Sequence, residues 1–216
     1  MPRFPLAGVR RFRSVACLGA LFALGPLAPR LSGQSVDTLS TSPFANADPY
    51  SRVTLRVGAT AGTPTNQLRN YYHGGAGPVV ELEMPFEFGN LGFTANAITY
   101  RGQQPQYYDI KANVLALDWR SRFLGSGPVR ARVGLRLGDM HMRYGGPNPT
   151  GLLLASEEML GGPTADVTLH LFGPMTASLG AAWLYSPSAS RAHVAYGTAA
   201  LSYTHGVPDW LRHFLE

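Results

Sequence analysis

The sequence predicts an all-β protein: an eight-stranded antiparallel up-and-down transmembrane β-barrel with a short C-terminal helix. Segments in which apolar and polar residues alternate recur eight times between residues 51 and 205, and in a β-strand such alternation places the two kinds on opposite faces. A basic and apolar leader precedes these segments. Charged residues make up only 14% of the chain, against about a quarter in typical soluble domains.

Residues 1–33 have the character of a secretory signal peptide. They contain five arginines and no acid, and the apolar run 15–28 is followed by small residues, where cleavage after Gly33 or Ser35 fits. A retained anchor is the alternative, although the run is short for a membrane-spanning helix. The only cysteine, Cys17, lies in this run, so no disulfide is expected in the mature chain.

The mature chain is expected to be electrically neutral. Subtracting the five leader arginines from 18 basic residues leaves 13, which equals the 13 acidic residues. Basicity therefore gives no support for nucleic-acid binding. Residues 34–50 are rich in Ser, Thr and Pro and are predicted to form a flexible lead-in.

The barrel is expected over residues 51–205, with strands at 51–61, 79–88, 92–101, 107–119, 129–143, 164–172, 175–185 and 194–204. Most are close to the roughly 9–11 residues that a tilted strand needs to cross a bilayer. Their apolar faces are expected to meet lipid and comprise, in order, Val53, Leu55, Val57, Ala59 and Ala61; Val80, Leu82, Met84, Phe86 and Phe88; Phe93, Ala95 and Ala97; Tyr108, Ile110, Ala112, Val114 and Ala116; Val129, Ala131, Val133, Leu135 and Leu137; Ala165, Val167, Leu169 and Leu171; Ala177, Leu179, Ala181 and Trp183; and Ala195, Gly197, Ala199, Leu201 and Tyr203.

The connections alternate in length, which predicts the orientation of the barrel. Tight turns are expected at Gly89-Asn90 and Gly173-Pro174, and a modest one at 121–127. Longer connections are expected at 62–78, 145–163 and 186–193, whereas 102–106 is short and departs from the trend. Short turns on the periplasmic side and longer loops outside are the rule for outer-membrane barrels.

The polar faces are expected to line a closed lumen. They carry five acids and five bases: Glu81, Glu83, Glu87, Asp109 and Asp166, with Arg56, Lys111, Arg130, Arg132 and Arg136. Eight strands leave an interior just wide enough for side chains, and buried charges must be paired. The equal counts therefore predict a salt-bridged plug, and Pro85 is expected at a bulge or at the end of a ladder.

Aromatic residues near the predicted strand ends suggest two membrane girdles. They are Phe86, Phe88, Phe93, Tyr100, Tyr108, Trp119, Phe172, Trp183, Tyr185 and Tyr203. With these features the chain resembles the small eight-stranded outer-membrane barrels of the OmpA/OmpX type. The resemblance covers residues 51–205 and concerns architecture. It implies a place in the outer membrane of a Gram-negative bacterium, contact with outer-membrane lipid and lipopolysaccharide, and insertion by the barrel-assembly machinery.

Two alternatives remain open at this stage. A soluble periplasmic lipocalin-like barrel would place the apolar faces inside. A lipid A-modifying hydrolase would need a nucleophile and a base, for which the weak candidates are His193, Ser188 and Ser190; the His-x-Ser arrangement of the lipid A deacylases is absent. A structural or surface-interaction role through the outer loops is favoured over both.

No metal or cofactor is indicated. The six histidines have no close ligand spacing, and Gly58–Gly62 lacks the Lys-Ser/Thr end of a phosphate loop. The tail 206–216 is predicted to form an amphipathic helix, because Pro208 and Asp209 suit a helix start and the apolar residues that follow cluster on one face.

Overall fold

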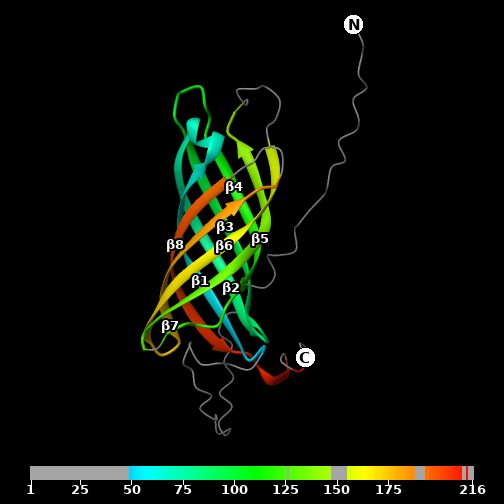
Figure 1. The fold of residues 1–216 in the computed structure, drawn as a ribbon, viewed down its shortest axis with the longest axis vertical. Coiled ribbons are helices and arrows are strands. Elements are labelled where there is room, and N and C mark those ends of the chain that lie inside the picture. The colour runs from blue at the N-terminus through cyan, green and yellow to red at the C-terminus, as the bar shows by residue number, and fades with distance from the viewer. Residues whose placement is uncertain (1–48, 126, 147–154, 188–192, 211–212, 214–216) are drawn as a thin grey trace, which may run out of the picture. The chain divides into compact units, whose positions relative to one another are not determined.

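The computed structural model describes residues 49–125, 127–146, 155–187, 193–210 and 213. They form eight strands and one short 3-10 helix: β1 (Arg52–Thr65), η1 (Asn66–Asn70), β2 (Tyr72–Phe86), β3 (Gly89–Gly102), β4 (Ile110–Arg120), β5 (Val129–Tyr144), β6 (Ala155–Phe172), β7 (Met175–Tyr185) and β8 (His193–Gly206). Each strand pairs antiparallel with the next, and β8 pairs with β1 to close the barrel (Figure 1). The predicted fold class is confirmed.

The two ends of the barrel differ. At the lower end, Arg52 of β1 lies opposite Gly206 of β8, and the turns β2–β3, β4–β5 and β6–β7 lie there too. The other four connections lie at the upper end, which includes η1 (Figure 1). Pro85 lies next to the last residue of β2, so it occupies a ladder end.

The strands are longer than the sequence predicts. β2 begins at Tyr72 and β6 at Ala155, so most of the predicted upper loop 62–78 and about half of the predicted loop 145–163 are strand. The glycine-rich start of β2 pairs on one side with β1 and on the other with β3. Glycine and alanine have low strand propensity, and here pairing with two neighbours overrides it.

The first hairpin turn is shifted by two residues. β2 ends at Phe86 and β3 begins at Gly89, whose φ is +140°. The turn is therefore formed by Glu87 and Phe88 and not by Gly89-Asn90. Glycine populates positive φ without a steric penalty, which allows the chain to enter β3 at once.

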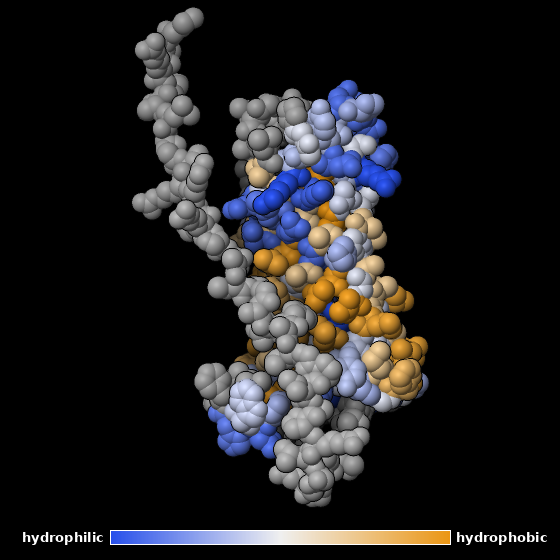
Figure 2. Space-filling view, turned by 180° about the vertical axis from the view of Figure 1, so that it is seen from behind, coloured by the Kyte–Doolittle hydropathy of each residue, from blue (hydrophilic) through white to orange (hydrophobic). Residues whose placement is uncertain are grey.

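The chemical character of the inward and outward side chains changes along the strands. In the lower part of β4, Leu115, Leu117 and Trp119 face outward; in its upper part, Ile110 and Val114 face inward. Apolar side chains thus cover the outside of the lower barrel and the inside of the upper barrel. Figure 2 shows the outer surface accordingly, with apolar residues around its middle and lower part and polar residues around its upper part.

This exchange limits the apolar outer belt to part of each strand. On β5 the outward residues from Val129 to Leu137 are apolar, and Asp139, His141 and Arg143 continue the same face. The nine residues from Val129 to Leu137 match the roughly 9–11 residues with which a tilted strand crosses a bilayer. The remaining length of β5 extends the barrel above the belt.

The chain outside the barrel is described only in part. The predicted signal peptide 1–33 and nearly all of the predicted lead-in lie outside the described residues. In the tail, Asp209, Trp210 and His213 have helical backbone, and the other residues beyond Trp210 lie outside the described residues, so the predicted helix stays a prediction. Among the residues that are described, no helix is long and apolar enough to cross a membrane.

Candidate functional site

The lower half of the lumen is filled by a charged layer of four arginines and four carboxylates. The arginines are Arg56, Arg120, Arg132 and Arg136, and the carboxylates are Glu81, Glu83, Asp118 and Asp166. Their residues are about nine-tenths buried or more; Arg132, for example, is 1% exposed. Equal numbers of opposite charges make the layer neutral, which is the condition for holding so many charges out of water.

Arg120 lies at the centre of this layer. Its guanidinium donates to Glu83 Oε2 (2.9 Å) and Glu81 Oε2 (2.8 Å), and it lies 3.7 Å from Asp118 and 3.9 Å from Asp166. All four carboxylates thus contact one cation. Arg56 closes the opposite side, at 3.3 Å from Glu83 and 3.7 Å from Glu81.

Arg132 and Arg136 complete the layer from β5. Arg132 Nε donates to Asp166 (3.0 Å), and its guanidinium lies 4.7 Å from the centre of the Phe123 ring. Arg136 bonds to Asp118 and donates to Glu81 Oε1 (3.0 Å), Thr94 Oγ1 (2.9 Å) and the Tyr196 hydroxyl. Thr94 in turn donates to Asp118. Each arginine therefore joins at least two strands.

The strand register creates this arrangement. Three opposite-charge pairs lie directly across neighbouring strands: Arg56 with Glu81, Asp118 with Arg136, and Arg132 with Asp166. Directly opposite pairs of this kind stabilise a sheet by about 0.2–1 kcal/mol each. The inward Gly134 makes room, because a Cβ there would lie 3.0 Å from Arg120 Cγ and 2.3 Å from the Trp119 carbonyl oxygen.

An apolar layer fills the upper half of the lumen. It consists of Tyr72, Ile98, Tyr100, Ile110, Ala112, Val114, Ala116, Met140, Met142, Leu160, Ala182, Leu184, Val194 and Tyr196. Leu184 has no exposed surface, and Ile98 and Ile110 are each 2% exposed. Tyr196 joins the two layers, because its ring packs in the apolar layer while its hydroxyl accepts from Arg136. The charged layer alone was predicted to close the lumen, and the apolar layer was missed.

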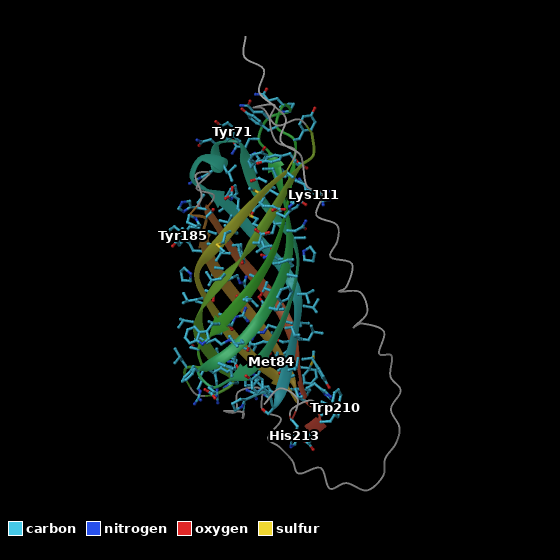
Figure 3. All side chains as sticks on the ribbon, turned by 90° about the vertical axis from the view of Figure 1, so that its right-hand side faces the viewer. Tyr71, Met84, Lys111, Tyr185, Trp210 and His213 are labelled. Carbon is cyan, nitrogen blue, oxygen red and sulfur yellow. The ribbon has the colours of Figure 1, made fainter. Side chains whose placement is uncertain are left out.

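Hydrogen bonds and ring contacts join the β1–β2 and β3–β4 connections above the apolar layer. Gln103 N–H donates to the Tyr71 carbonyl (2.9 Å), and Gln103 Nε2 donates to the Arg69 carbonyl (2.7 Å). The rings of Tyr71 and Tyr107 meet edge to face with centroids 5.3 Å apart, and Leu68 and Tyr107 pack on the apolar layer. We call the segments 66–71 and 103–109 the clasp. Tyr71, labelled at the top of Figure 3, is 44% exposed, and Tyr108 is 47% exposed.

The predicted lumen residues divide into three groups. Arg56, Glu81, Glu83, Arg132, Arg136 and Asp166 lie in the charged layer. Arg130 is half-buried below it at the lower mouth, where its Nε donates to the Gly127 carbonyl (3.3 Å). Glu87, Asp109 and Lys111 are exposed, so their prediction is wrong. Glu87 lies in the shifted turn, Asp109 precedes β4 and accepts from Gly102 N–H (3.2 Å), and Lys111 faces outward.

Asp118 and Arg120 were missed because β4 was assigned to the wrong side. Its first half repeats apolar residues at even positions from Ile110 to Ala116, a pattern that predicts a lipid-facing side. Its second half places Leu115, Leu117 and Trp119 at odd positions, with Asp118 and Arg120 between them. That second alternation is the signal that could have identified both residues.

The predicted girdle residues differ in where their side chains lie. Phe86 and Phe93, with Phe88, Trp119, Phe172 and Tyr203, are at least partly exposed toward the lower end, and Tyr108, Trp183 and Tyr185 are exposed toward the upper end. Tyr100 is the exception: at 4% exposure it points into the apolar layer. Tyr100 lies on the same inward face of β3 as Thr94 and Asn96, as strand alternation requires, so its assignment to the girdle is wrong. The Trp119 indole also donates to the Phe88 carbonyl (3.1 Å) across the lower turns.

The hydrolase candidates are not brought together by the described residues. His193 begins β8 with its ring 6.3 Å from that of Tyr185, while Ser188 and Ser190 lie outside the described residues. In the described part of the chain, no group of three or more His, Cys, Asp or Glu side chains is arranged to hold a metal ion. The soluble lipocalin-like alternative required apolar strand faces to lie inside throughout, whereas in the lower barrel residues such as Leu117 and Leu137 are 69% and 67% exposed.

Comparisons with known proteins support the fold alone. No family model matches the chain, and no curated protein sequence matches it. Among solved structures, Neisserial surface protein A matches with a TM-score of 0.53 and 14% identity, over 70% of this chain and 96% of that chain. The attachment invasion locus protein Ail of Yersinia pestis, solved in complex with the heparin analogue sucrose octasulfate, matches with a TM-score of 0.50 and 12% identity, over 72% of this chain and 99% of that chain. The chain is thus a closed eight-stranded barrel with the architecture of the small outer-membrane barrel proteins.

Proposed function

We propose that this protein is an outer-membrane barrel with a closed lumen, whose role is structural or lies in interactions at the cell surface. The exposed apolar belt supports the membrane location, because contiguous apolar surface of this extent is rare on soluble monomers. The charged interior below and the polar exterior above fit a barrel whose lower part spans the bilayer. The upper end then faces outside and the lower end faces the periplasm.

The observation that carries the closed lumen is the succession of two filled layers. A permeant ion would first have to separate the pairs around Arg120 and then pass apolar side chains such as Ile98, Met140 and Leu184. The cavities near the charged layer hold only about 20 Å³ and 10 Å³ of water-accessible volume, about the size of a single water site. Steady transport of solutes is therefore not expected.

Planar-bilayer recording tests the closed lumen. The reconstituted wild-type protein is expected to show no steady conductance, because the charged and apolar layers fill the pore. The matched variant Leu184→Ser with Met140→Ser introduces polar side chains into the apolar layer and should raise the frequency of brief openings. A large stable current from the wild type would contradict the proposal and favour a channel.

Surface interactions would involve the upper end. The clasp is braced by the Gln103 hydrogen bonds and presents exposed Tyr71, Tyr108 and Arg69. Tyrosine and arginine dominate the residues that contribute most to binding at protein interfaces, and a braced surface loses less entropy when it binds. Recovery of the protein in the outer-membrane fraction, with heat-modifiable migration on a gel, tests the location. Recovery as a soluble periplasmic protein would refute it.

A further prediction concerns recognition by the barrel-assembly machinery. Tyr203 faces outward near the lower end of β8, opposite Leu55 and Met175, where a lipid-facing aromatic of the last strand belongs. Truncation after His205 removes only one of the fourteen residue pairs between β1 and β8, so the barrel should still insert. Tyr203→Asp should reduce the inserted fraction strongly. The reverse result would identify Trp210 and the tail as the recognised element.

A further inference from the structure

Two cations lie directly opposite each other on the outside of the upper barrel. Lys111 of β4 is the Cα partner of Arg143 of β5, and both side chains are exposed and face outward. Like charges in this position destabilise a sheet. Within the described residues, neither side chain forms an ion pair with a carboxylate. An anion bound between the two side chains would remove their repulsion.

Among the described residues, the acids that neighbour this pair on the same face form no ion pair with it. Thr99, across from Lys111 on β3, adds an exposed hydroxyl. Arg143 Nε donates to His141 Nε2 (3.1 Å), and His141 Nδ1 lies 3.4 Å from Glu157. The acid of β6 therefore contacts the histidine and not the arginine, whose remaining N–H groups stay available. The other charged groups on this face are Arg101, Asp109 and Asp139.

The height of the pair on the barrel indicates what kind of anion it meets. Leu115 is the highest large apolar residue on the outward face of β4, and Lys111 lies four residues above it. At about 3.3 Å per residue and a tilt of about 40°, this separation is about 10 Å along the barrel axis. Figure 3 shows Lys111 between the levels of Tyr185 and Tyr71. The pair therefore lies where the polar headgroups follow the hydrocarbon layer.

We propose that Lys111 and Arg143, with the Thr99 hydroxyl, form a binding site for the phosphate of a lipid headgroup in the outer leaflet. The guanidinium of Arg143 offers parallel N–H donors that suit phosphate oxygens, and Lys111 supplies a second charge. The site rests on the proposed membrane location and gives that proposal a specific lipid chemistry. It would fix the height and rotation of the barrel in the leaflet.

Lipid binding by the intact protein tests the site. The wild type is reconstituted in phosphatidylcholine nanodiscs and titrated with bisphosphorylated lipid A, and bound lipid is counted by native mass spectrometry. The variant Lys111→Gln with Arg143→Gln should bind at least about tenfold more weakly, because it removes both positive charges that face the phosphate. Lys111→Arg should retain binding. Arg122→Gln, which removes an exposed arginine at the lower end of the barrel, is the matched control and should leave binding unchanged.

Three results would overturn the proposal. They are equal binding by the double variant and the wild type, equal binding of dephosphorylated lipid A, and displacement of the lipid by a few millimolar inorganic phosphate, which would indicate a site for soluble anions. Heat-modifiable migration of each sample shows whether the barrel is folded and inserted. Failure to insert would count against the proposed function, whereas loss of phosphate selectivity in an inserted barrel would count against this site alone.

Discussion

Replacing Arg120 by alanine is expected to lower the free energy of unfolding by about 3–5 kcal/mol, the cost of leaving buried charges without their partner. Arg120 contacts all four carboxylates of the charged layer and is 5% exposed. Its removal leaves three arginines against four acids. Urea unfolding of the protein in lipid vesicles, followed by loss of heat-modifiable migration, measures the effect.

Two further variants make the test specific to charge. Arg122→Ala removes an exposed arginine two residues away, whose guanidinium donates to the Glu87 carbonyl (3.2 Å) outside the layer, and should change stability by less than about 0.5 kcal/mol. Adding Glu83→Gln to Arg120→Ala restores neutrality and should recover part of the loss. If Arg120→Ala unfolds like the wild type, the charged layer does not stabilise the barrel and some other contact holds the strands in register.

The strand count could be predicted because it depends on a local signal. Period-two alternation in segments such as 129–143 identifies a strand whatever its partner is. The upper loops were predicted too long for the same reason: Gly74 to Gly77 carry no alternation, and they become strand only through pairing with β1 and β3. Pairing partners are not visible in a single segment.

The composition of the charged layer could be predicted only in part, because one strand passes through two environments. Above the belt the outward side chains of β4 meet water and its inward side chains are apolar. Within the belt the outward side chains are apolar and the inward ones are charged. A single assignment for the whole strand placed Lys111 inside and left Asp118 and Arg120 unassigned. Tyr100 on β3 was assigned to the girdle from its place near the strand end, although the alternation puts it on the inward face with Thr94 and Asn96. Strands of 14 to 18 residues, as in β1 and β6, exceed the length of the belt, so the exchange follows from their length.

The exchange of faces leads to a prediction that separates a membrane barrel from a soluble one. Leu117→Arg is expected to lower the free energy of unfolding in lipid vesicles by about 2–4 kcal/mol, the cost of a charge facing lipid near the middle of a bilayer. Leu117 is 69% exposed, so the substitution disturbs little packing and the longer side chain has room outside the barrel. The cost arises only if hydrocarbon surrounds it.

Asn113→Arg is the matched control, because Asn113 lies four residues higher on the same outward face of β4 and is likewise exposed. There the new arginine would reach headgroups or water, and the expected change is below about 1 kcal/mol, the value for charges near the interface. In a soluble barrel both positions face water, and both substitutions would be nearly neutral. Equal, small effects at the two positions would therefore exclude a bilayer around Leu117, whereas a large effect at Leu117 alone places the upper edge of the hydrocarbon between these two residues.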